Sequence, residues 1–172
     1  ITGTGLLHSF GTRKIQTFVG TLAATDTGTA YGDGDVLVEL GTLDTSAPSG
    51  VVTASKFYIH RALVGITTAA GQTLIGGLML SATSGTATNS AVSSGTEIAG
   101  AGVASFNPRI SATDSVTEVD INYNNTAGLY HIFNPNINAA IASKYLYAFT
   151  TTTLNADASA GRFTVELEYS VY

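Results

Sequence analysis

The last twelve residues, GRFTVELEYSVY (161–172), decide the fold class. Apolar and polar side chains alternate along them, and side chains on a β-strand point alternately to opposite faces of its sheet. The polar face would carry threonine, glutamate and serine, and the apolar face would carry Phe163, Val165, Leu167, Tyr169 and Val171. We expect this segment to be a central strand of a sheet, with its Phe163–Val171 face buried.

The same period-two pattern recurs upstream, separated by the Gly, Pro, Asn, Asp and Ser clusters that are typical of turns. A long, small-residue loop that carries a short strand is expected at 83–105, and only NINAAIAS (136–143) suggests a helix. Asn136 would cap that helix, and Ile137 and Ile141 lie one turn apart. The longest strand should bend or bulge near Gly65. Strands are predicted at 5–10, 13–20, 35–40, 56–68, 72–82, 115–124, 128–134 and 144–153.

About eight to ten strands without a long helix indicate one all-β domain, an antiparallel β-sandwich of two sheets with about four strands each. A jelly roll suits this count and the long 83–105 connection better than an immunoglobulin-like sandwich, which needs only about seven strands. We expect the sandwich domain to span 21–172. Residues 1–20 would be an extended N-terminal arm that lies across a neighbouring subunit, or the first strands of the sandwich.

Composition argues against several classes of function. The net charge is −5, and Arg13 and Lys14 are the only adjacent pair among seven basic residues, so no basic stripe is present to bind nucleic acid. The sequence contains no run of about 18 apolar residues, so no membrane-spanning helix is predicted. Cysteine is absent, so the chain has neither disulfides nor thiol chemistry. The first ten residues lack the basic region and cleavage site of a signal peptide.

Histidine and serine residues give no sequence pattern of a catalytic or zinc site. His8, His60 and His131 lie in three separate predicted strands, without the close spacing that zinc ligands usually have. The chain contains no G-x-S-x-G nucleophile elbow, so a serine hydrolase is not expected.

Acidic residues give two weaker candidates. The loop with Asp26, Asp33 and Asp35 could offer carboxylates to Ca²⁺, but it lacks D-x-D-x-D-G spacing, and Asp-Gly beside a strand is typical of a turn. Glu166 and Glu168 would lie about 7 Å apart on one strand face, within the range of a glycosidase pair. Such neighbouring charges are usually solvated or guard a sheet edge against aggregation. We therefore predict no catalytic, cofactor-binding or metal site, and no enzymatic activity.

The segment FYIHRALVGITTAAGQTLIGGLML (57–80) reads as a strand that ends in Thr-Thr, a small turn and a second strand. Together with the turn at Ser159–Gly161 and the terminal FTVELEYSVY, it resembles the jelly-roll decoration, or cement, proteins of tailed bacteriophage heads. The resemblance covers about residues 51–172 and brings no site residue with it. It implies a virion protein on the capsid surface that binds the major capsid protein and cements the capsid.

Low charge and abundant Thr, Ser and Asn suit the close packing of many copies, and closed cyclic symmetry is usual for identical subunits. We therefore expect a homotrimer, whose contacts could use Tyr58, Ile59 and Phe106. Two other classes stay open, a self-assembling capsid or fibre subunit and a carbohydrate-binding β-sandwich module. In the second, sugar rings would stack on exposed tyrosines among Tyr31, Tyr58, Tyr130, Tyr145 and Tyr147.

Overall fold

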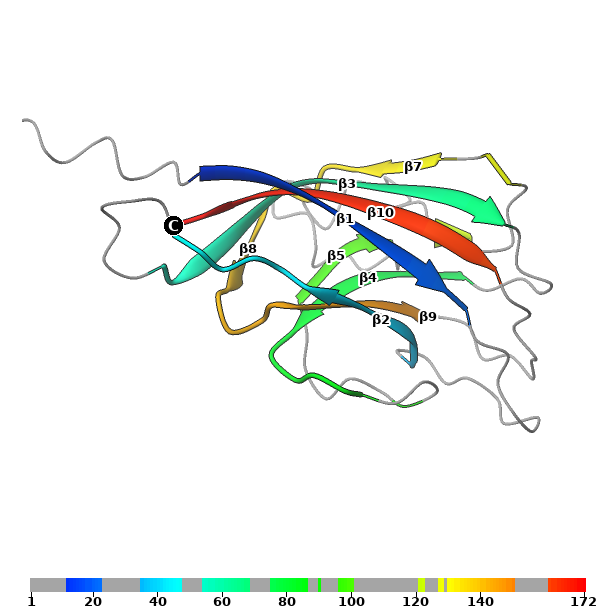
Figure 1. Cartoon of the computed structure of the whole chain (residues 1–172), viewed down its shortest axis with the longest axis horizontal. Coiled ribbons are helices and arrows are strands. Elements are labelled where there is room, and N and C mark those ends of the chain that lie inside the picture. The colour runs from blue at the N-terminus through cyan, green and yellow to red at the C-terminus, as the bar shows by residue number, and fades with distance from the viewer. Residues whose placement is uncertain are drawn as a thin grey trace, which may run out of the picture.

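Two antiparallel sheets face each other in the computed structural model (Figure 1). The structure describes residues 12–22, 35–47, 54–68, 75–86, 90, 96–100, 121–122, 127–128, 130–150 and 161–172. Within these ranges the strands are β1 (Thr12–Thr21), β2 (Val36–Thr42), β3 (Lys56–Thr68), β4 (Ile75–Ser81), β5 (Thr96–Gly100), β6 (Ile121–Asn122), β7 (Tyr130–Phe133), β8 (Ile137–Ala140), β9 (Tyr145–Thr150) and β10 (Arg162–Val171).

The strand order is that of a jelly roll. Sheet 1 runs β1-β10-β3, and the short strands β7 and β8 follow each other along the far edge of β3. Sheet 2 runs β2-β9-β4, with β5 and β6 along the far edge of β4. The chain thus alternates between the sheets from β1 to β4, and it returns through β9 and β10 to lie between strands formed earlier. The predicted all-β, jelly-roll-like sandwich is confirmed.

The terminal strand β10 is central, as predicted. It pairs with β1 along its whole length on one side and with β3 on the other, as the red strand between them shows in Figure 1. Its inward side chains are at most 1% exposed: Phe163, Val165, Leu167, Tyr169 and Val171. At about 25 cal/mol per Å² of apolar surface, burying one such side chain contributes about 2 kcal/mol, so this strand supplies much of the core.

The core fills the space between the sheets. Phe57 on β3 meets the Tyr169 ring edge-on, with centroids 5.7 Å apart. Gly20 on β1 allows the closest approach, because a Cβ there would lie 2.7 Å from Leu40 Cδ2 and against the ring of Phe163. A second buried cluster lies on the opposite face of sheet 2 and contains Val36, Met79, Tyr147 and Phe149. Sheet 2 therefore buries apolar side chains on both of its faces.

The bounds of the longest strand were predicted correctly, and the bulge expected near Gly65 lies two residues away at Thr67, whereas a second bulge at His60 was not predicted. The register between β3 and β10 shifts at His60 and again at Thr67, while Gly65 pairs regularly with Thr164. A bulge inserts one extra residue into one strand of a pair and turns its side chain. The glycine at 65 has another cause, because the ring of Tyr130 occupies the space above it, and a Cβ there would lie 2.8 Å from Tyr130 Cε1.

The helix predicted at 136–143 is wrong. Residues 137–140 form β8, which pairs with Lys56–Ile59 of β3. The same segment also fits a period of two, with Ile137 and Ala139 toward the core and Asn138 and Ala140 exposed. A helix this short is unstable in isolation, whereas pairing with β3 satisfies the backbone. Asn136 adopts a left-handed conformation (φ 49°) instead of capping a helix.

Several predicted segments lie wholly or partly outside the described residues. The strand at 5–10 and the proposed arm over the first residues are among them, whereas 13–20 lie within β1. The 83–105 stretch does contain a short strand, β5, and the 115–124 strand is represented by β6 alone. The described residues include no helix with the length and apolar character needed to cross a membrane.

Candidate interaction surface

The outer face of sheet 1 carries four large apolar side chains that are exposed. Ile15 and Val19 lie on β1, at one edge, with 63% and 65% of their surface exposed. Tyr130 and Ile132 lie on β7, at the other edge, and are 69% and 62% exposed. We call these four residues the outer apolar face. They contrast with the outer face of sheet 2, where the apolar side chains are buried.

The inward face of β1 is more polar than its outward face at one end of the sandwich. Lys14 and Gln16 point inward, opposite Tyr169 and Leu167, and Phe18 follows them into the core. Lys14 is only 14% exposed although it carries a charge. A buried charge needs ion-pair and hydrogen-bond partners. The partners of Lys14 lie in the segment that follows β2.

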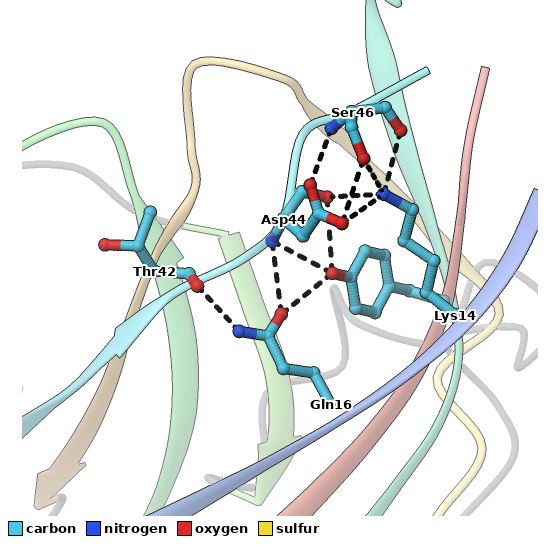
Figure 2. Close-up of polar contacts among 6 residues, drawn as sticks. Lys14, Gln16, Thr42, Asp44 and Ser46 are labelled. Atoms are coloured by element: carbon cyan, nitrogen blue, oxygen red, sulfur yellow. Dashed lines mark hydrogen bonds and ion pairs between the residues drawn. The ribbon is translucent and has the colours of Figure 1, made fainter. Parts of the chain in front are cut away.

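A polar network joins the two sheets at this end (Figure 2). The Lys14 ammonium donates to Asp44 Oδ2 at 2.6 Å, to Ser46 Oγ at 2.7 Å and to the Ser46 carbonyl at 2.8 Å. The Asp44 backbone N–H donates to the Tyr169 hydroxyl at 3.0 Å, and that hydroxyl lies 2.8 Å from Gln16 Oε1. Gln16 Nε2 in turn donates to the Thr42 carbonyl at 2.9 Å.

Two pKa shifts reflect this network. The hydrogen bond from Lys14, with those from Ser46, lowers the pKa of Asp44 to about 2. Burial raises the pKa of Tyr169 to about 12. Both groups therefore keep one protonation state across the physiological range, which suits a structural connection between β1, β10 and the segment after β2.

Charged side chains form a compact cluster in the middle of the outer face of sheet 1. Arg61 Nη2 lies 2.6 Å from Glu166 Oε1, and Arg61 Nε lies 3.4 Å from Glu168 Oε2 without hydrogen-bond geometry. Arg13 pairs with the other oxygen of Glu168. Two arginines and two glutamates thus cancel in charge. Each partly exposed pair contributes at most about 1 kcal/mol.

The two glutamates do not guard an edge, as one interpretation of the sequence had it, because β10 is a central strand. They are not free carboxylates either. Glu166 is held by Arg61, and Glu168 by both arginines. A glycosidase pair needs one carboxyl group with a raised pKa and one that is free to act as nucleophile or base. Both carboxylates are engaged by arginine side chains, so this pair does not fit that chemistry.

His60 and Ser170 form the pair that most resembles catalytic machinery. Their side chains lie 2.8 Å apart on the outer face of sheet 1. Burial, followed by the charge of Arg13, lowers the pKa of His60 and favours its neutral form. A serine nucleophile also needs a carboxylate to orient the histidine, and the nearby Glu168 is engaged by two arginines. The pair is best understood as a polar contact at the β3 bulge.

The described histidines do not converge. His60 lies on the outer face of sheet 1, whereas His131 pairs opposite Val64 on the inward side of β7 and stacks on Phe133 at 6.4 Å. Burial lowers the pKa of His131. Among the described residues, no three His, Asp or Glu side chains are grouped as metal ligands would be. His8 lies outside the described residues, as do Asp26 and Asp33 of the proposed calcium loop, while Asp35 precedes β2.

Two expectations about aromatic and interface residues are wrong. Tyr147 is fully buried, with its hydroxyl 2.8 Å from both Glu39 Oε2 and the Thr83 carbonyl, so it cannot stack on a sugar. Ile59 belongs to the core instead of a subunit interface. Tyr58 lies on the outer face of sheet 1 beside His60. Tyr31 and Phe106 lie outside the described residues.

Sequence reasoning missed the outer apolar face. The β1 sequence alternates, but both of its faces contain apolar residues, so the pattern alone did not show which face is buried. The polar residues Lys14 and Gln16 would have indicated the inward face of β1 only if their partners in the fold had been known.

No model of a known protein family matches the sequence, and no curated protein matches it. A functional assignment therefore depends on the fold and on the surface described above.

Proposed function

We propose that this chain is a non-enzymatic structural protein of a virion, which decorates and cements a phage capsid by binding its major capsid protein. Its place would be the capsid surface. The observation that carries the proposal is the outer apolar face of a jelly-roll sheet, whose members flank a central cluster of paired arginines and glutamates. Exposed apolar residues gathered on one face are typical of a surface that contacts another protein.

The fold supports the virion assignment by analogy. Jelly rolls recur in viral capsid proteins, lectins and cupins, and a fold alone does not assign a function. The surface chemistry favours the first of these classes. The charged groups in the middle of the outer face, Arg13, Arg61, Glu166 and Glu168, are paired with one another, and apolar groups are exposed on either side of them, as suits packing against protein.

The carbohydrate-binding alternative is weakened by the burial of Tyr147. Of the remaining described tyrosines, Tyr58 and Tyr130 share the outer face of sheet 1 but lie near opposite ends of β3. The β10 residues that pair at their two levels, Thr164 and Ser170, are six positions apart, so at about 3.4 Å per residue the two tyrosines are separated by about 20 Å along the strands. One sugar ring cannot contact both.

Capsid cementing is tested by heating decorated and undecorated heads and measuring the release of packaged DNA. We expect heads that carry the protein to survive a higher temperature, because each bound copy would hold neighbouring capsid subunits together. A matched control adds a Leu167→Asp chain, which should not fold because it places an unpaired charge in the core. Equal survival of decorated and undecorated heads would refute the cementing role.

A self-assembling capsid or fibre subunit is the second candidate, and the same exposed face favours it. Light scattering of the purified protein separates the two. A small, closed oligomer of two or three copies supports decoration, three being the number expected from the sequence. Shells or filaments formed by the chain alone would support self-assembly.

A further inference from the structure

We propose that two copies of this chain pack through the outer faces of sheet 1, related by a two-fold axis that runs along the strands between β10 and β3. The inference rests on the proposed structural role for its biological meaning and names what covers the outer apolar face, a second copy of the chain, so that the dimer would meet the major capsid protein through other surfaces. It is argued from the register of sheet 1 and from the side chains on its outer face.

The register sorts the outward side chains into rows across the sheet. Read from β1 to β7, two successive rows contain Val19, Thr164, Gly65 and Tyr130, and then Thr17, Glu166, Leu63 and Ile132. A two-fold axis along the strands keeps each row level and exchanges its two ends. Val19 of one copy then faces Tyr130 of the other. Thr17 of one copy faces Ile132 of the other. Ile15 and Val19 are the outward residues before and after Thr17 on β1.

This arrangement places Val19, Tyr130 and Ile132 against apolar or neutral groups of the other copy and leaves Ile15 at the rim, one row from Ile132 of that copy. The ring of Tyr130 lies against Gly65, so Val19 of the other copy would meet this ring where the sheet itself has no side chain. An axis perpendicular to the strands would behave differently, because it would place β1 over β1 and leave the β7 residues facing each other.

The charges are complementary under the same operation. The next row contains Ile15, Glu168 and Arg61, so Glu168 of one copy faces Arg61 of the other, twice over. Glu166 faces Leu63, and no glutamate faces a glutamate. Arg13, Arg61, Glu166 and Glu168 cancel within the central cluster, while the exposed cations Arg162 and Lys56 lie toward the two ends of the face. The middles of the two faces therefore approach without net repulsion.

The footprint indicates a contact of modest strength. Four strands about 4.8 Å apart and rows spanning about 20 Å give a flat area of about 400 Å² per copy. Side-chain relief increases the buried accessible area, which still lies at or below the roughly 800 Å² per partner of a standard stable interface. The dimer should therefore dissociate on dilution, and a covalent trap is the appropriate test.

Cysteine cross-linking tests the geometry directly, because the wild-type chain has no cysteine. Facing sheets lie about 10 Å apart, so a short bis-maleimide is the suitable reagent. The double variant Val19→Cys/Tyr130→Cys should give a covalent dimer on a denaturing gel, while each single variant should stay monomeric. The inference is overturned by no cross-link in the double variant, by dimers of Val19→Cys alone, or by a ladder that reaches trimer, as a head-to-tail ring would give.

A second set of variants connects this contact to association in solution. Ile132→Lys should abolish the concentration-dependent dimer in light scattering, and Ser84→Lys, an exposed position before β5, should leave it intact. Thermal denaturation of both variants serves as the control that they are folded. A folded Ile132→Lys chain that still dimerises contradicts the inference.

Capsid binding is measured separately on the same variants. A wild-type dimer that fails to bind heads refutes the proposed function and leaves the dimer standing. Wild-type protein that stays monomeric at all concentrations yet cements heads refutes the dimer and leaves the function standing.

Discussion

Shortening Leu167 to alanine is the sharpest test of the packing, because Leu167 is fully buried in the central strand of sheet 1. Leucine-to-alanine substitutions at such positions lower the free energy of unfolding by about 2–5 kcal/mol, from lost burial and the cavity that remains. For a chain of this size, 1 kcal/mol shifts Tm by about 2–4 °C. At about 3 kcal/mol, we expect Leu167→Ala to lower Tm by about 6–12 °C.

The matched control lies on the neighbouring strand and the other face of the same sheet. Ile15 is 63% exposed, so Ile15→Ala should change the stability by less than about 0.5 kcal/mol. Both variants are measured by thermal denaturation at low protein concentration, where association between copies contributes little. A Leu167→Ala melt within 2 °C of wild type, or equal losses in the two variants, would refute the assignment of faces.

Two further predictions concern the polar contacts of the sandwich. Because the pKa of Asp44 is lowered to about 2, its carboxylate stabilises the fold above its unfolded pKa near 3.8, and this stabilisation is lost as the pH falls toward about 2. The Tm advantage of wild type over Asp44→Asn should therefore shrink between about pH 4 and pH 2, and a constant difference across that range would contradict the role of the Lys14–Asp44 pair. Tyr147→Phe should lower the free energy of unfolding by about 1–2 kcal/mol in urea denaturation, because Glu39 and the Thr83 carbonyl lose the tyrosine hydroxyl as a partner. A variant as stable as wild type would show that this hydroxyl adds nothing net.

The fold was largely predictable because its strands have one apolar and one polar face. The alternation in 161–172 predicted both the strand and its buried face. The central position that we also expected for this strand is the one observed. The prediction failed at 136–143, where the spacing of Ile137 and Ile141 fits a helix while Ile137 and Ala139 fit a strand. Pairing with β3 decided between them, and that contact is remote in sequence.

The interaction surface was less predictable, for a physical reason seen in β1. Its outward face carries Ile15 and Val19, and its inward face carries Lys14 and Gln16. Hydrophobicity alone would predict the opposite orientation, with Ile15 and Val19 facing the core. The network with Asp44 and Tyr169 makes the observed orientation stable, and those partners are 28 to 153 positions away along the chain.

The central claim is that this protein is a structural component of a virion, and quantitative mass spectrometry of purified particles tests it most directly. We predict that the chain is found in intact particles at a fixed ratio to the major capsid protein. The ratio should stay constant through successive density gradients, since a bound structural component co-purifies with the head. Absence of the chain from purified particles, or a ratio that falls toward zero with each gradient, would contradict the account.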